Sequence, residues 1–142
     1  RQAARMRPTI YSAQLPMVER YDLATTSWEE VAPMVTPHEN LAVAALDGKL
    51  YAVGGFDGGR LSSVERYDPA ANAWEEVAPM GEERSEHGVA VLDGKLYAVG
   101  GYSDDGGVLS SVERYDPALD AWEAVAPMPT ARMSLGVAVL DG

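Results

Sequence analysis

Leu46-Asp47-Gly48-Lys49-Leu50-Tyr51-Ala52-Val53-Gly54-Gly55 occurs a second time, without a single change, as residues 92–101. A second motif, Val-Glu-Arg-Tyr-Asp, begins at residues 18, 64 and 112, and each copy is followed by a tryptophan and then by Val-Ala-Pro-Met. Residues 64–80 and 112–128 agree at 14 of 17 positions. The tryptophans Trp28, Trp74 and Trp122 are 46 and 48 residues apart, so the chain is built from a repeat of that length.

Each repeat predicts four short strands, which in the second repeat are residues 41–46, 49–53, 63–67 and 74–77. Asp47-Gly48 marks a tight hairpin, Gly54-Gly55 ends the second strand, and Asp68-Pro69 ends the third. The first strand lacks a clean apolar–polar alternation, which indicates a sheet covered on both faces. No stretch shows a helical period, so we expect an all-β fold.

Gly-Gly after an apolar strand, then Tyr-Asp, then a tryptophan, resembles the Kelch repeat over roughly residues 12–142. The resemblance implies a β-propeller, here a partial ring of about three four-stranded antiparallel blades within a single domain, residues 1–142. The strand before Asp-Gly would be innermost and the tryptophan strand outermost. The expected parts are an incomplete blade at about 10–34, blades at about 40–80 and 86–128, and the innermost strand of another blade at 135–140.

The resemblance also implies packing roles. The glycine pairs would let neighbouring backbones approach closely, and the repeated tyrosines and tryptophans would fill the space between blades. Arg84 and Arg132 match the buried structural arginine of the family, whereas Pro37 or His38 stands near that place in the preceding repeat. Residues 7–11 stand where the second strand of the first blade is expected. Two accounts of the open ring remain: a longer chain of about six blades, or two copies that exchange Leu135–Leu140.

The composition excludes several classes of function. Eleven basic and twenty-two acidic residues give a formal charge of −11, with no cluster of Lys or Arg to bind phosphates, so we expect no nucleic-acid or membrane partner. No apolar run approaches the roughly 20 residues that a membrane helix needs. The sequence has no cysteine, which excludes disulfides and cysteine-ligated metals. This composition suits an intracellular protein, and we expect a cytoplasmic one.

The sequence offers little material for catalysis, metal binding or a cofactor. Only two histidines exist, and Ser85-Glu86-His87 is a local triplet of loop residues, unlike a catalytic triad assembled through space. The loop aspartates, including Asp57, lack the spaced ligands of a calcium loop. The glycine-rich loop after Val53 joins two strands and does not enter a helix, so it is no dinucleotide loop. Copper radical oxidases of similar fold need a cysteine, and no acid–base set of a sugar epimerase can be located. We expect a protein that is not an enzyme.

In adaptors of the Kelch-like type, the resemblance places protein binding on a rim formed by two kinds of loop. The corresponding polar positions are arginines in several adaptors; here they are Asn40, Glu86 and Ser134, which favours a neutral or basic ligand. An alternative for the aromatic residues Phe56 and Tyr102 is that they only cover loop backbone. Two functions follow: substrate recognition in a Kelch-like (BTB-Kelch) ubiquitin-ligase adaptor, or an actin-associated structural scaffold. The expected rim residues are Asn40, Phe56, Arg60, Glu86, Tyr102, Asp104, Asp105 and Ser134.

Overall fold

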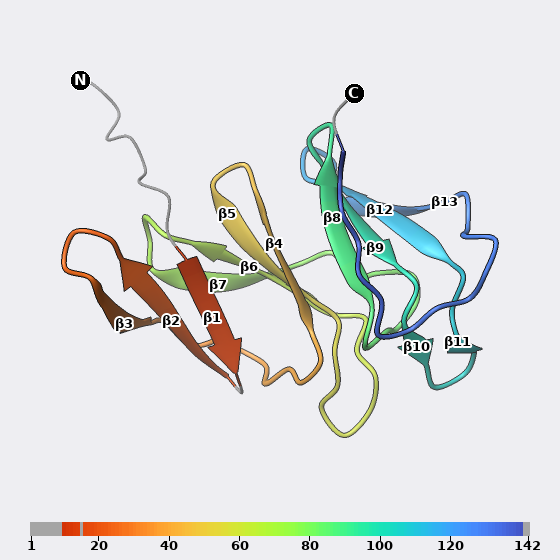
Figure 1. The fold of residues 1–142 in the computed structure, drawn as a ribbon, viewed down its shortest axis with the longest axis horizontal. Helices are drawn as coiled ribbons and strands as arrows, with labels where there is room; N and C mark the ends of the chain where they lie inside the picture. Colours follow the sequence, from red (N-terminus) through yellow and green to blue (C-terminus); the bar gives the residue numbers. More distant parts are fainter. Residues whose placement is uncertain (1–9, 15, 141–142) are drawn as a thin grey trace.

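The computed structural model describes residues 10–14 and 16–140, and every regular element in that part of the chain is a β-strand. Figure 1 shows three main sheets that fan out beside one another, each made of antiparallel strands in a meander. The prediction of an all-β fold with antiparallel blades is confirmed. Within the described residues, no helix is long and apolar enough to cross a membrane.

The second blade is the clearest example of the repeat. Its strands follow one another across the sheet in chain order, and the second strand coincides with the predicted range 49–53. Asp47 and Gly48 both have a positive φ, as a two-residue hairpin turn requires. The other three strands begin or end within one residue of their predicted ranges. The strands are β4 (Ala42–Leu46), β5 (Lys49–Val53), β6 (Val64–Asp68) and β7 (Ala73–Val77).

The third blade repeats this arrangement, with one addition in the loop between its second and third strands. That loop holds the two extra residues of the repeat and folds into a small hairpin of β10 (Tyr102–Ser103) and β11 (Gly107–Val108). The main strands are β8 (Gly88–Leu92), β9 (Lys95–Val99), β12 (Val112–Asp116) and β13 (Ala121–Val125), with β8 at one edge and β13 at the other.

The first sheet has three strands, β1 (Ile10–Gln14), β2 (Met17–Asp22) and β3 (Ser27–Val31). β1 occupies the place of a second strand, because Tyr11 pairs with Arg20 in the same way as Tyr51 pairs with Arg66 in the next blade. Residues 7–9 of the expected strand lie outside the described residues.

The segment 135–140 differs from expectation, because it is not a strand in the structure. It runs alongside β8 (Figure 1), and a Cβ added to Gly88 would lie 2.3 Å from a methyl of Val137. A strand requires a hydrogen-bonded neighbour, and no strand of the described residues pairs with this segment. The segment places the side chains of Val137 and Leu135 against Gly88 of β8. The turn expected at Asp141-Gly142 lies outside the described residues.

The hydrophobic core lies between blades. One cluster joins the second and third blades and includes the fully buried rings of Tyr51 and Tyr115, whose centroids are 5.6 Å apart. A smaller cluster around Val18, Met34 and Ala52 joins the first and second blades. Neighbouring blades cover both faces of the middle strands β5 and β6. The first strand, β4, instead alternates between half-buried and exposed residues, so the expectation that it is covered on both faces is wrong.

A repeated set of hydrogen bonds, here called the outer latch, joins the outer parts of neighbouring blades. Trp74 donates its indole N–H to the carbonyl of Ala32 (2.8 Å), while the N–H of Ala32 donates to the side chain of Asn72 (2.9 Å). Tyr67 also donates its hydroxyl to Asn72 (2.8 Å). The same three bonds recur one repeat later, with Trp122, Ala78, Asp120 and Tyr115.

The first tryptophan does not behave like the other two. Trp28 is 49% exposed, and no earlier blade exists among the described residues to accept its N–H. The prediction that all three tryptophans fill space between blades is therefore wrong for Trp28. The ring packs on Tyr21 of its own sheet, at a centroid distance of 5.4 Å.

The glycine pairs allow the close approach of backbones that the sequence predicts. A Cβ on Gly54 would lie 2.5 Å from the carbonyl oxygen of Arg84, and one on Gly100 would lie 2.6 Å from that of Arg132. Both glycines also have a positive φ. No side chain fits at these positions without moving backbone.

Arg84 is the buried arginine that the sequence predicts. Its guanidinium is fully buried and donates to the carbonyls of Gly100 (2.8 Å) and Ser111 (3.1 Å) and to the carboxylate of Glu113 (2.8 Å). We call this set the arginine clamp, because it ties the linker into the third blade to the body of that blade. The same prediction for Arg132 is wrong: that residue is exposed. The equivalents of the Arg84 partners one repeat later are not in this sequence.

Candidate protein-binding rim

The loops expected to bind a partner lie together at one end of the blades, the lower edge in Figure 1. They are the linkers that lead into β4 and β8 and the loops after β5 and β9. Backbone pairs fix them to one another: Glu39 and Phe56 exchange two hydrogen bonds (2.9 and 2.7 Å), as do Ser85 and Tyr102 (3.0 and 2.8 Å). The rim therefore rests on paired backbone, and its loops are held in place by the blades beneath.

Arg60 is the centre of a cluster that joins the second and third blades at the rim. Its guanidinium lies 5.1 Å from the ring centroid of Phe56 and 4.7 Å from that of Tyr102. It also donates to Asp104 (2.9 Å) and, through Nε, to the hydroxyl of Ser85 (3.3 Å). Four of the predicted residues, two rings and an ion pair, thus form one contiguous surface.

Asp104 neutralises this arginine. Its carboxylate accepts from the backbone N–H of Arg60 (3.1 Å) as well as from the guanidinium. These two bonds lower the pKa of Asp104 below its ordinary value, with the backbone bond as the larger cause. Asp104 is therefore ionised at neutral pH, and Arg60 offers little free charge to an acidic ligand.

Three other predicted residues form a row along the inner side of the rim. Asn40, Glu86 and Ser134 all have φ near +50°, at 49°, 53° and 51°. The N–H of Glu86 donates to the carbonyl of Asn40 (3.3 Å), and the N–H of Ser134 donates to that of Glu86 (2.8 Å). This row steps from one blade to the next, so the side chains of its members occur at equivalent positions of successive blades.

The charge of the rim is negative outside the Arg60–Asp104 pair. Asp105 is exposed and belongs to neither group above, and Asp57 and Glu39 are also exposed. Within the described residues, none of these three carboxylates makes an ion pair. A positively charged partner would meet a favourable potential here.

The sequence interpretation missed two residues that support the cluster. Ser85 is buried and accepts from Arg60, and Glu83 accepts from the backbone N–H of Asp104 (3.2 Å). For the ion pair of Arg60 with Asp104, the sequence contained one indication: the two residues have opposite charges and stand in equivalent loops of successive repeats.

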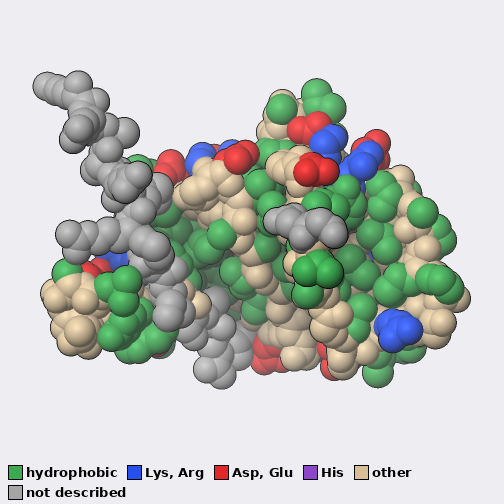
Figure 2. All heavy atoms as spheres, turned by 45° about the horizontal axis from the view of Figure 1, so that its top comes forward, with side chains coloured by type: hydrophobic (Ala, Val, Ile, Leu, Met, Phe, Trp, Pro, Cys, Tyr) green, Lys and Arg blue, Asp and Glu red, His purple; other side chains and the backbone are tan. Residues whose placement is uncertain are grey.

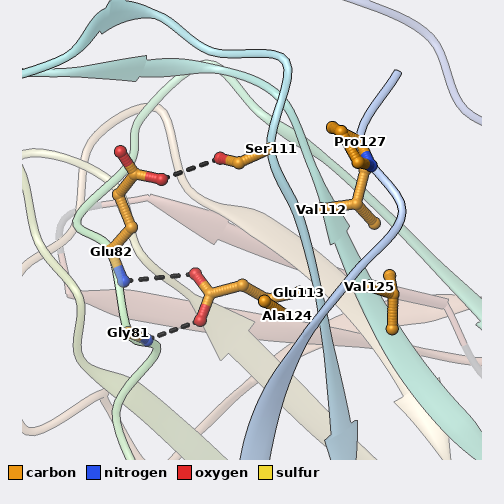
Figure 3. A pocket seen from close by; sticks show the side chains of 8 residues that line it. All are labelled: Gly81, Glu82, Ser111, Val112, Glu113, Ala124, Val125 and Pro127. Carbon is orange, nitrogen blue, oxygen red and sulfur yellow. Dashed lines mark hydrogen bonds between the residues drawn. The ribbon is translucent and has the colours of Figure 1, made fainter. Parts of the chain in front are cut away.

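A hollow of about 550 Å³ lies below the rim, beside the arginine clamp. Figure 3 shows that its polar groups face one another: Glu113 accepts from the backbone N–H groups of Gly81 (2.6 Å) and Glu82 (3.2 Å), and Glu82 accepts from the hydroxyl of Ser111 (2.7 Å). The opposite wall is apolar and includes Val112 and Val125. The polar groups of the hollow bind one another or nearby backbone. We therefore take the rim, and not the hollow, as the candidate site.

The remaining chemistry is sparse. His87 is buried, and among the described residues neither ring nitrogen has a hydrogen-bond partner. Burial, followed by the nearby charge of Arg84, lowers the pKa of His87 to about 4, so the ring is neutral at physiological pH. The described residues also contain no group of three or more His, Asp or Glu side chains arranged to hold a metal ion.

Comparison with known proteins agrees with this architecture. The family model of the Kelch motif matches residues 38–81 and again residues 83–129. The chain belongs to the Kelch-repeat family. The two matched Kelch motifs contain the second and third blades with their linkers, including both His38 and Arg84.

Relatives and a solved structure show the extent of the similarity. Mouse Kelch-like protein 1 is 49% identical over 47 residues, and human Kelch-like protein 4 is 54% identical over 41 residues. These matches cover 33% and 29% of this Kelch chain, and each covers only 6% of the relative. The solved structure of YjhT superposes on 80% of this chain with a TM-score of 0.71 at 18% identity, and 46% of that structure is covered, which shows a shared fold.

Proposed function

We propose that this chain is a protein-binding Kelch module whose rim recognises a partner, as the substrate-recognition part of a Kelch-like ubiquitin-ligase adaptor. The observation that supports it most directly is the cluster of Phe56, Arg60 and Tyr102, which sets two half-buried rings and a guanidinium side by side on paired backbone loops. Aromatic and arginine side chains dominate the binding energy of protein interfaces. The similarity of short segments to Kelch-like proteins favours the adaptor role over a scaffold. A protein that acts by binding needs no catalytic group.

The partner segment we propose is neutral or basic. Asp104 already neutralises Arg60, and the exposed carboxylates of Glu39, Asp57 and Asp105 leave the rim negative. An acidic peptide would have to displace Asp104 from two hydrogen bonds before reaching the guanidinium. A basic segment needs no such exchange.

The test is affinity capture from extract of the source cells, followed by binding of each captured protein in purified form. Tyr102→Ala and Asp105→Lys should each weaken binding at least about tenfold, as loss of an interface anchor or reversal of a charge does. Glu76→Lys on the outer strand β7 is the matched charge control and should bind like the wild type.

Binding of a basic partner should weaken as salt rises, because the attraction is between exposed charges. Equal binding by all three variants would place the interface elsewhere on the ring. Selective co-sedimentation with actin filaments, unaffected by the rim changes, would favour the cytoskeletal scaffold instead.

A further inference from the structure

The linker into the second blade carries a histidine where the linker into the third blade carries the clamp arginine. His38 precedes Arg84 by 46 residues, the period of the repeat. Both are buried, and each contacts the carboxylate of the equivalent third-strand glutamate, Glu65 or Glu113. Each also contacts the carbonyl of the first glycine in the pair that ends the second strand, Gly54 or Gly100. His38 thus replaces the arginine and keeps two of its contacts, to the glycine carbonyl and to the glutamate.

The geometry requires a second proton on this pair. Nδ1 of His38 lies 2.5 Å from the carbonyl oxygen of Gly54, and Nε2 lies 2.8 Å from a carboxylate oxygen of Glu65. Glu65 already accepts from the backbone N–H groups of Val35 (2.7 Å) and Thr36 (3.3 Å). A neutral imidazole has one N–H, so one ring nitrogen would turn a lone pair toward an oxygen acceptor. Both contacts are hydrogen bonds only when the His38–Glu65 pair carries an added proton, that is, one more than a neutral imidazole and an ionised carboxylate hold together.

The histidine also leaves a gap in the contacts that the arginine makes. In the third blade, Ser111 accepts from Arg84 through its hydroxyl (3.3 Å). The equivalent hydroxyl, on Ser63, is buried without a hydrogen-bond partner among the described residues. An imidazole has no further N–H to reach it. His38 therefore makes fewer hydrogen bonds than Arg84 does. The contact at the second blade depends more on the attraction between a protonated His38 ring and the Glu65 carboxylate.

The groups around His38 favour the added proton. Burial lowers the pKa of His38, but the bonds to Glu65 and to the Gly54 carbonyl, with the charges of Glu65 and Asp57, outweigh burial and leave the pKa above its ordinary value. In the neighbouring linker, Arg84 directs its guanidinium into the third blade, and His87 is neutral above a pH of about 4. In its own linker, Glu39 is exposed.

We propose that the His38–Glu65 pair is a proton-operated clamp, which fixes the linker into the second blade only while the pair keeps its added proton. The clamp lies directly below the rim, because Glu39 follows His38 and exchanges backbone bonds with Phe56, two residues after Gly54. Loss of the proton loosens this part of the rim, including Asn40 and Phe56, while the arginine clamp keeps the equivalent part at the third blade. The regulatory consequence rests on the proposed function of the rim; the clamp itself does not.

The direction of the pH effect follows from linkage. The pKa of His38 is higher in the folded chain than the ordinary value of about 6.5 for an unfolded chain. The stabilisation is therefore fully present below about pH 6.5 and is lost as the pH rises through the folded pKa. The clamp opens as the pH rises through the raised pKa of His38.

The experiment compares the two rim pairs by amide hydrogen exchange between pH 6 and 9, in the wild type and in His38→Arg. Exchange rates are first corrected for their intrinsic pH dependence. In the wild type, the rates of the Glu39 and Phe56 amides should then rise with pH relative to those of Ser85 and Tyr102. The expected rise is about tenfold for each unit by which folding raises the pKa of His38. In His38→Arg the two pairs should exchange in parallel, because arginine stays charged. These amides report on the clamp without any partner, so the result is independent of whether the rim binds protein.

A ring titration of His38 by nuclear magnetic resonance completes the test. A ring pKa above about 6.5 that returns toward it in Glu65→Gln supports the clamp. The reverse exchange, Arg84→His, should transfer the pH dependence to the Ser85 and Tyr102 amides. A ring pKa below about 6.5, or a wild type in which the two amide pairs stay parallel to pH 9, would overturn the proposal.

Discussion

At the scale of single residues, the two histidines of this chain occupy opposite environments. His38 has an acceptor at each ring nitrogen, whereas His87 has no partner among the described residues and stands where the equivalent residues are Leu41 and Leu135. One ring is favoured in its protonated form and the other in its neutral form. Each therefore affects stability on a different side of pH 6.5, the ordinary value.

The first prediction concerns His87. Its pKa is lowered from 6.5 to about 4, so the unfolded chain binds more protons between these values and stability falls as the pH drops from 6.5 to 4. The loss should approach about 3 kcal/mol at the acid end. In His87→Leu this loss should disappear, and the variant should be more stable than the wild type near pH 4 in urea titrations. If the free energy of unfolding of the variant falls between pH 6.5 and 4 as much as that of the wild type, protonation of carboxylates is the cause and the prediction is wrong.

The second prediction separates core from rim. Tyr67 is fully buried between the first and second blades, whereas Tyr102 is half-buried and lies on Arg60. Tyr67→Ala should cost about 3–5 kcal/mol, as large core truncations do. Tyr102→Ala should cost about 1 kcal/mol, because its backbone pair with Ser85 remains. Denaturant midpoints measure both, and equal losses would mean that the Tyr102 ring serves the core.

At the scale of elements, the environment of a motif is set by the neighbouring repeat. Trp28 and Trp74 are both followed by Glu-Glu-Val-Ala-Pro-Met, yet of the two only Trp74 donates to a carbonyl within the described residues, that of Ala32 in the blade before it. Arg84 and Arg132 differ in the same way: the third blade supplies acceptors to the Arg84 guanidinium, whereas Arg132 is exposed and no further blade follows it within the described residues. The motif determines the strand, and contacts between blades determine burial.

The third prediction tests the outer latch. Trp74→Phe keeps an aromatic ring but removes the N–H that Ala32 accepts, and it should cost about 1–2 kcal/mol. Trp28→Phe is the matched control, because Trp28 is 49% exposed, and it should change stability by less than about 0.5 kcal/mol. Equilibrium unfolding in urea measures both. If both variants lose the same amount, the latch contributes nothing beyond ring packing.

At the scale of the whole molecule, hydrophobic side chains remain exposed along the innermost elements. Val43, Leu92 and Val139 are each at least 40% exposed, and Leu140 is 92% exposed. Figure 2 shows hydrophobic side chains spread across the face that it presents, with charged side chains near its upper margin and at its lower edge. β1 also has a neighbour on one side only among the described strands. Such surfaces are covered when a ring closes.

The fourth prediction follows from these surfaces. In isolation the 142-residue chain, of 15.2 kDa, should not run as a stable monomer, because the exposed apolar side chains and the open edge of β1 favour association. Light scattering after size-exclusion chromatography measures the mass, and Leu140→Lys should reduce the associated fraction. A discrete dimer would support exchange of residues 135–140 between copies. A cooperatively unfolding 15.2 kDa monomer would contradict both accounts of the open ring.

The sequence was sufficient for the main strands of the second and third blades, because each follows from motifs that recur within one repeat. The strand expected at 135–140 is absent from the structure, because no neighbouring strand pairs with that segment among the described residues. It was insufficient where a residue depends on another repeat. The ion pair of Arg60 and Asp104 joins loops 44 residues apart, one of which carries the two extra residues and forms its own hairpin. The role of His38 depends on whether its shorter ring reaches both Gly54 and Glu65, which only coordinates can show. Both features arise from departures between repeats, where periodicity gives no information.

The outer latch bears on how such a chain can grow and be redesigned. Trp74 and Asn72 bind the backbone C=O and N–H of Ala32 in the preceding blade, which any residue other than proline would present equally well. On the preceding blade the outer latch therefore binds only backbone atoms. These bonds do not distinguish one preceding blade from another. A gene segment encoding one repeat, copied in tandem, would carry both halves of the latch with it. The latch by itself therefore leaves the number of blades unspecified.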